Sequence, residues 1–161
     1  MKEVSPPLPV ENVQSYPRPP IVEAVPQRIR VFFADTLIVD TIRAHRVLET
    51  HHPPTYYIPP DDVTCDLMPA NGRSFCEWKG FARYFDVRVA GLSSRSAAWC
   101  YDDPSPTFSV IRHHLAFYAD KMDRCLVGDM AVDAQAGSFY GGWITANLKG
   151  VPKGAPGTEH W

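Results

Sequence analysis

Short alternations of apolar and polar residues recur between residues 28 and 127, with turn-forming residues between them. Residues 28–33 alternate arginine with isoleucine and valine, as a half-buried strand does. Residues 34–35 predict a turn and residues 37–39 predict its partner strand. Further strands are predicted at residues 56–58, 65–68, 75–79, 82–89, 97–101, 115–118 and 124–127. Many short strands with frequent turns predict a mainly β chain, either a sandwich, a barrel or a similar antiparallel architecture.

Three local patterns add detail to this prediction. Residues 41–49 place apolar side chains at about helical spacing, so one or two helical turns are expected before Pro53. A second helical turn is expected near residues 108–113. Asn71 and Gly72 form a strong hairpin-turn signal between two predicted strands.

Proline and glycine mark the two ends of the predicted domain. Residues 1–16 are proline-rich and predict a flexible arm, because proline fixes φ and removes a backbone donor. Residues 17–150 are expected to form a single β domain, and residues 151–161 a loose C-terminal tail. The arm has an alternative interpretation as a proline ligand for an SH3-type partner.

Composition narrows the classes of partner. The 161 residues carry a net charge of −2 and their basic residues are scattered, so nucleic acid is not an expected partner. No apolar run reaches the roughly 20 residues of a membrane helix, and the first residues lack the apolar centre of a secretory signal. A cytoplasmic protein without a membrane partner is expected. The sequence is compatible with a homo-oligomer and leaves the oligomeric state open.

The cysteines and histidines do not show the spacing of a metal site. Four cysteines occur without a C-x-x-C pair, and we expect them to be small buried hydrophobic residues. His45 and Glu49 have the spacing of two ligands on a helix but lack a visible third ligand. The adjacent histidines at 51–52 and 113–114 are expected to be structural or exposed. The prediction is therefore a domain with no metal and no cofactor.

The stretch at residues 75–84 is the most informative for chemistry. If it is a strand, Glu77 and Lys79 share one face. Lys79 can then polarise a carbonyl, donate a proton or attack as an amine, and Glu77 can serve as a base. Tyr84 or Tyr140 completes the predicted catalytic set. The alternative is an exposed strand face whose ion pair contributes little.

Aromatic residues form the second element of the predicted site. Tyr140 and Trp143 flank Gly141 and Gly142, a pair that suits tight backbone geometry or close approach to a ligand. Rings of this kind can enclose a flat or cationic molecule, although Trp99 is expected to belong to the core. Arginines near residue 46 can anchor a carboxylate substrate, or tie the predicted helix to the sheet. The residues expected to bind the substrate are Arg43, Glu49, Tyr57, Trp99, Tyr101 and Trp143.

Several segments together resemble one family. They are residues 46–49 (RVLE), 54–59 (PTYYIP), 74–80 (SFCEWKG), 97–101 (AAWCY) and 139–143 (FYGGW). The chain resembles the domain-of-unknown-function family 427 from about residue 16 to residue 150. The resemblance implies an Mss4-like or β-tent fold, in which two antiparallel sheets of short strands meet at an angle, with one or two short helices. Relatives of that fold often carry zinc on paired cysteines, which are missing here.

The resemblance also implies a nucleotidyltransferase label, which the residues support little. There is no D-x-D pair for two magnesium ions and no glycine-rich phosphate loop. The acidic pairs at residues 61–62 and 102–103 lie beside prolines, where turn and capping roles explain them. A G-x-S-x-G elbow and a Rossmann motif are absent as well.

The leading hypothesis is a β domain that binds a small organic molecule in an aromatic-lined cavity. It includes cofactor-free acid–base catalysis of the isomerase, cyclase or lyase type. The alternative is a noncatalytic module that recognises a peptide or protein through a sheet edge or the proline-rich arm. Nucleotidyl transfer is the third hypothesis.

Overall fold

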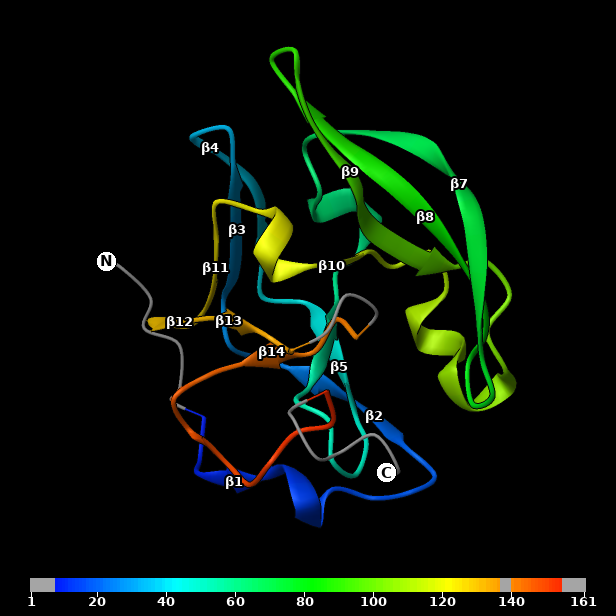
Figure 1. Cartoon of the computed structure of the whole chain (residues 1–161), viewed down its shortest axis with the longest axis vertical. Coiled ribbons are helices and arrows are strands. Elements are labelled where there is room, and N and C mark those ends of the chain that lie inside the picture. Colours follow the sequence, from blue (N-terminus) through cyan, green and yellow to red (C-terminus); the bar gives the residue numbers. More distant parts are fainter. Residues whose placement is uncertain (1–7, 137–139, 155–161) are drawn as a thin grey trace.

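The computed structural model describes residues 8–136 and 140–154, and these residues are mainly β (Figure 1). The strands are β1 (Glu11–Asn12), β2 (Ile21–Val25), β3 (Ile29–Phe33), β4 (Thr36–Thr41), β5 (Ala44–Leu48), β6 (Thr55–Tyr57), β7 (Asp66–Cys76), β8 (Gly80–Val89), β9 (Leu92–Tyr101), β10 (Ala116–Phe117), β11 (Arg124–Val127), β12 (Met130–Ala131), β13 (Asp133–Ala134), β14 (Trp143–Ile144) and β15 (Leu148–Lys149). The helical segments of the described residues are 3-10 helices: η1 (Val13–Ser15), η2 (Pro60–Asp62), η3 (Pro106–Ile111) and η4 (Ala119–Lys121). None of them has the length and apolar character required to cross a membrane.

Three antiparallel sheets form the body of the described chain. Their strand orders are β10-β9-β8-β7, β12-β11-β3-β4 and β2-β5-β6. Strands β13 and β14 form an antiparallel pair, and β1 and β15 form a parallel one. The predicted mainly β fold of antiparallel sheets is therefore confirmed. Figure 1 shows the sheet of β7, β8 and β9 beside strands β3, β4 and β11.

Strand β9 contributes to a different hydrophobic cluster on each of its faces. Ala98 and Cys100 belong to the main core, which also contains buried residues of β3, β4, β8 and β11. Trp99 and Tyr101 belong to a second cluster, together with Tyr57 of β6 and residues of η3. The division follows from the strand, because successive side chains point to opposite faces. The large sheet thus separates the core from the second cluster.

Several local predictions are confirmed. The turn at residues 34–35 joins β3 to β4, and Ala34 and Asp35 both have positive φ, at 52° and 56°. Strand β11 has the predicted bounds, and the helical turn predicted at residues 108–113 overlaps η3. Two of the four cysteines are buried as expected, and burial raises the pKa of the Cys100 thiol to about 11 and that of Cys125 to about 12. Cys65 and Cys76 are only half-buried, and Cys76 lines a cavity.

The helix predicted at residues 41–49 is wrong, because the structure has strand β5 there. Strand β5 lies between β2 and β6 and pairs with both. Its apolar residues Ala44, Val47 and Leu48 fit a helical spacing, but hydrogen bonds from two neighbouring strands decide the conformation. His45 and Glu49 therefore do not share a helical face.

The hairpin predicted at Asn71 and Gly72 is also wrong. Both residues lie inside β7, where the pairing with β8 shifts between Pro69 and Arg73. Gly72 has a φ of +93°, so the pair does supply the positive φ that its sequence favours. The chain uses that conformation for an irregularity within a strand, and reverses direction later, at residues 77–79.

The described residues 8–16 of the predicted flexible arm pack against the domain. Val13 is buried, and β1 lies beside β15. The Arg46 guanidinium of β5 donates two hydrogen bonds to the Glu11 carboxylate, at 3.0 and 2.7 Å, and Tyr16 donates a third at 2.7 Å. Burial alone would raise the pKa of Glu11, but the hydrogen bonds from Arg46 and Tyr16 lower it below its usual value.

Candidate functional site

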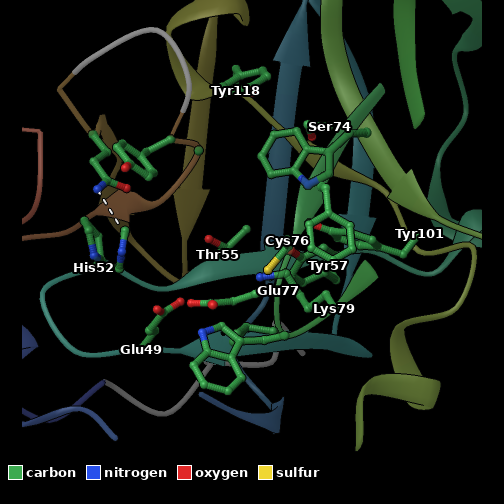
Figure 2. Close-up of a pocket in the computed structure, with 18 of the residues that line it drawn as sticks. Glu49, His52, Thr55, Tyr57, Ser74, Cys76, Glu77, Lys79, Tyr101 and Tyr118 are labelled. Carbon is green, nitrogen blue, oxygen red and sulfur yellow. Dashed lines mark hydrogen bonds between the residues drawn. The ribbon is translucent and has the colours of Figure 1, made fainter. Parts of the chain in front are cut away.

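A cavity of about 540 Å³ lies over the second hydrophobic cluster (Figure 2). It is bounded by β5 and β6 on one side and by β7, β8 and β9 on the other, and residues 135, 140, 141 and 153 complete its wall. The residues that line it are Val47, Glu49, His52, Pro53, Thr55, Tyr57, Ser74, Phe75, Cys76, Glu77, Trp78, Lys79, Tyr84, Trp99, Tyr101, Tyr118, Gln135, Tyr140, Gly141 and Lys153. All four residues predicted to be catalytic and four of the six predicted to bind substrate are among them.

Aromatic rings form the buried walls of the cavity. The rings of Tyr57 and Tyr101 have centroids 6.3 Å apart, and those of Trp99 and Tyr118 are 4.6 Å apart. Burial is the main cause that raises the pKa of Tyr57, Tyr101 and Tyr118 above the usual value of a tyrosine, so all three are neutral phenols at physiological pH. Trp99, which was expected to be a core residue, is both buried in the second cluster and exposed to the cavity along one edge.

The two glycines after Tyr140 allow close approach to protein atoms. A Cβ atom on Gly141 would lie 2.0 Å from Cη2 of Trp99. A Cβ atom on Gly142 would lie 2.7 Å from the carbonyl oxygen of Pro53. Any larger residue would therefore push this segment away from β9, and the glycines keep Tyr140 at the cavity.

Lys79 brings an ammonium group into the cavity. Residues 77–79 form the turn between β7 and β8, so the strand expected there is wrong at this point and Glu77, Trp78 and Lys79 all line the cavity. Two hydrogen bonds from Ser105 hold this turn in place. Ser105 Oγ donates to the Trp78 carbonyl at 2.6 Å, and the Ser105 backbone amide donates to the Lys79 carbonyl at 3.1 Å. Lys79 is 9% exposed, and its Nζ lies 5.7 Å from the centroid of the Tyr101 ring.

Glu49, Glu77 and Tyr84 lie around the same cavity. Glu77 is exposed at the turn, and Glu49 is half-buried with one carboxylate oxygen 3.8 Å from Arg18. The Tyr84 hydroxyl and Ser74 Oγ lie 2.7 Å apart and share a hydrogen bond. Both residues also line a second, more open cavity of about 360 Å³.

His52 is a site residue that the sequence did not reveal. Burial is the main cause that lowers its pKa to about 4, and the positive charges of Lys153 and Lys79 lower it further. The Gln135 side-chain amide donates to His52 Nδ1 at 3.3 Å. An amide nitrogen only donates, so Nδ1 accepts and the proton of the neutral ring is on Nε2.

The orientation of His52 depends on two distant segments. The Gln135 side-chain amide nitrogen also donates to the Lys153 carbonyl at 2.6 Å. The Gln135 side-chain oxygen accepts a hydrogen bond from the Gly142 backbone amide at 3.2 Å. The Lys153 amide in turn donates to the His51 carbonyl at 2.6 Å. Lys153 of the predicted loose tail therefore contributes to the cavity, and only the tertiary fold brings these groups together.

Two predicted substrate-binding residues lie outside the cavity. Arg43 is exposed and pairs with Asp62 at 2.9 Å, since β5 replaces the expected helix and turns this arginine away. Trp143 is buried in the main core, where its Nε1 donates to the Phe117 carbonyl at 2.9 Å and its ring stacks on Tyr56. Both residues are structural in this fold.

The sequence of residues 21–128 matches the family described as a domain of unknown function, DUF427. The match spans strands β2 to β11 and more than half of the chain. The chain belongs to the domain-of-unknown-function family 427. No curated protein matches it. The β-tent assignment that the resemblance implied stays a prediction.

The family-427 segment contributes most of the cavity, from Val47 on β5 to Tyr118 beyond β10. Gln135, Tyr140 and Lys153 come from the chain after that segment. Phe139 of the resembling motif lies outside the described residues.

Several carboxylates elsewhere in this family-427 chain are paired with arginine. Asp62 accepts hydrogen bonds from Thr41 and Arg43, and Asp102 binds Arg83 at 2.7 Å. Among the described residues no three His, Cys, Asp or Glu side chains are grouped closely enough to hold a metal ion. The acidic pairs at residues 61–62 and 102–103 therefore include structural ion pairs.

Proposed function

We propose that the cavity binds a small organic molecule and that its polar groups carry out acid–base catalysis without a cofactor. The observation that carries the proposal is the position of Lys79, which is 9% exposed and lines a 540 Å³ cavity with its ammonium near the Tyr101 ring. Cavities of roughly 300–1,000 Å³ with mainly aromatic walls and a few polar groups are typical of small-molecule sites.

The walls favour a flat molecule. Tyr57, Trp99 and Tyr101 present ring surfaces to the cavity, and aromatic side chains pack well against planar groups. Figure 2 shows Tyr57 and Tyr101 on one side, with Glu49, His52 and Thr55 on the other. A planar molecule between these two sides would contact apolar and polar groups at the same time.

The polar groups support proton transfer between two positions of such a molecule. Lys79 is the proposed proton donor or the group that polarises a carbonyl, and Glu77 is the proposed base. His52 is neutral because of its low pKa, so it contributes a hydrogen bond from Nε2 rather than a positive charge. Tyr84 and Tyr140 supply further hydroxyl groups. Isomerisation, cyclisation, dehydration and lyase reactions need groups of this kind.

The test uses Lys79→Ala and Tyr140→Phe with a library of small planar compounds. The proposal predicts that some compounds raise the melting temperature of the wild type and that turnover of the substrate among them is lost in both variants. Lys149→Ala, an exposed lysine on β15, is the matched control and keeps both properties. A library without stabilising compounds, or turnover that survives Lys79→Ala, contradicts the proposal.

A noncatalytic module that recognises a peptide remains the alternative. It predicts that a peptide partner binds equally well to the wild type and to Lys79→Ala, because the recognition surface would then be a sheet edge or the proline-rich arm. Loss of peptide binding in Lys79→Ala would show that the cavity, rather than a sheet edge or the arm, is the binding site. A cytoplasmic location and a homo-oligomeric state stay predictions.

A further inference from the structure

Lys79 is buried without an opposite charge. Among the described residues, no carboxylate oxygen lies within 4.0 Å of its Nζ, and no hydrogen bond from this nitrogen is formed. The Tyr101 ring, at 5.7 Å, is its neighbour in the cavity wall. The Lys79 Nζ is not among the fully buried unpaired nitrogen atoms of the described residues, so it is open to the cavity, and the aromatic face offers only a partial counter-charge. The free protein therefore holds a positive charge that a bound molecule can neutralise.

Lys153 brings a second positively charged side chain to the cavity. Lys153 lines the cavity, and its Nζ lies 5.6 Å from the centroid of the Tyr140 ring. Lys79 and Lys153 both lower the pKa of His52, which lies between β5 and β6. His52 itself adds no charge when neutral. The charges that act on the pKa of His52 in this part of the cavity are therefore positive ones.

Neither Glu49 nor Glu77, the acidic residues among the described cavity lining, pairs with Lys79. Glu49 lies 3.8 Å from Arg18, and Glu77 is exposed at the turn. Among the described residues that line the cavity there is no arginine, and Lys79 is the one charged residue that is buried. Phosphate groups are commonly held by arginine forks or by several backbone amides, whereas an ammonium pairs as a point charge with a carboxylate.

We infer that the molecule bound in this cavity is a planar carboxylate, with its carboxylate group paired to Lys79 and its unsaturated or aromatic frame between the rings. The inference rests on the proposed function and specifies the class of its ligand. Binding replaces the missing counter-ion and places the atoms next to the carboxylate within reach of the acid–base groups.

The test uses matched compounds that differ only in charge. Benzoate, cinnamate and indole-3-acetate are each compared with the corresponding primary amide and amine by isothermal titration calorimetry. We expect at least one acid to bind about tenfold more tightly than its amide. The preference should disappear in Lys79→Met, which keeps the length of the side chain, and persist in Lys149→Met.

The outcomes separate this inference from the proposed function. Equal binding of acids and amides, tighter binding of amines, or an acid preference that survives Lys79→Met overturns the inference while the cavity remains a binding site. If compounds of all three classes fail to bind, the proposed function fails and the inference fails with it. The melting temperature of Lys79→Met, measured without ligand, shows whether this variant is folded.

Discussion

At the scale of single residues, the unpaired ammonium of Lys79 determines how a substitution there affects stability. Lys79→Met removes an unpaired ammonium and keeps the mostly buried apolar stem beside Tyr101. Because the ammonium has no ion-pair or hydrogen-bond partner among the described residues, its removal is expected to change the free energy of unfolding by less than about 1 kcal/mol. Thermal unfolding of the two proteins without ligand measures this. A fall of several degrees would mean that the ammonium has a stabilising partner.

His52 makes stability depend on pH. Its pKa is about 4 in the folded protein and near 6.5 when unfolded, so the unfolded chain binds the proton first as the pH falls. The free energy of unfolding should therefore fall by about 2 kcal/mol between pH 7.5 and pH 5 because of His52. In His52→Asn this part of the loss should vanish.

Urea unfolding of the wild type and His52→Asn at both pH values isolates the effect, because the other titrating groups cancel in the difference. Lys79, Lys153, Arg18 and His51 keep their influence on the site in both proteins. An identical pH dependence in the two proteins would show that His52 binds its proton readily in the folded state.

At the scale of elements, the contact between β1 and β5 should decide whether the N-terminal segment stays docked. Arg46, with a side chain 7% exposed, binds Glu11 in a bidentate manner and also binds Glu23. Glu11→Gln leaves this buried guanidinium with one fewer charge partner, and we expect a loss of about 3 kcal/mol in the free energy of unfolding. Glu23→Gln is the control, because the Glu23 side chain is 43% exposed and should cost less.

The same contact has a predicted pH dependence. The folded pKa of Glu11 is below its unfolded value, so its stabilising effect is present above about pH 4.5 and is lost as the pH falls through the folded pKa. Limited proteolysis of residues 8–16 should therefore accelerate in acid and in Glu11→Gln. Equal proteolysis rates in Glu11→Gln and Glu23→Gln would contradict this account of the contact.

Elements with a strong local signal could be predicted, and elements formed by distant pairing could not. The turn at residues 34–35 and strand β11 were found because their residue types and alternation favour one conformation. Strand β5 was missed because Ala44, Val47 and Leu48 fit two periodicities, and only β2 and β6 select between them. The positive φ at Gly72 could be predicted from the residue type. Whether this conformation forms a hairpin turn or an irregularity within a strand depends on the pairing with β8.

Some residues of the candidate site could likewise be predicted from the sequence, and others could not. Lys79 and Glu77 could be predicted because charged residues stand there among aromatic ones, a pattern that an ordinary strand does not require. His52, Gln135 and Lys153 could not be predicted, since their hydrogen bonds join residues 18 and 83 positions apart in the chain. Trp143 was misplaced because a tryptophan beside glycines is equally compatible with a core.

At the scale of the whole molecule, one sheet separates a stabilising core from a binding cavity. Ala98 and Cys100 of β9 pack into the core while Trp99 and Tyr101 face the second cluster. The cavity is closed by segments from β5 to Lys153, so it exists only when the domain is folded. A ligand that binds there binds only the folded state, and it should raise the melting temperature in proportion to its concentration and affinity.

The tryptophan indole signals give the most direct test of this arrangement. The chain has four tryptophans; Trp78 and Trp99 line the cavity, whereas Trp143 is buried in the core with its Nε1 bonded to the Phe117 carbonyl. In ¹⁵N-resolved spectra, titration with a binding planar carboxylate should shift the indole signals of Trp78 and Trp99 and leave that of Trp143 in place. Shifts confined to Trp143, or four unchanged signals in the presence of a compound that binds, would contradict a ligand site in this cavity.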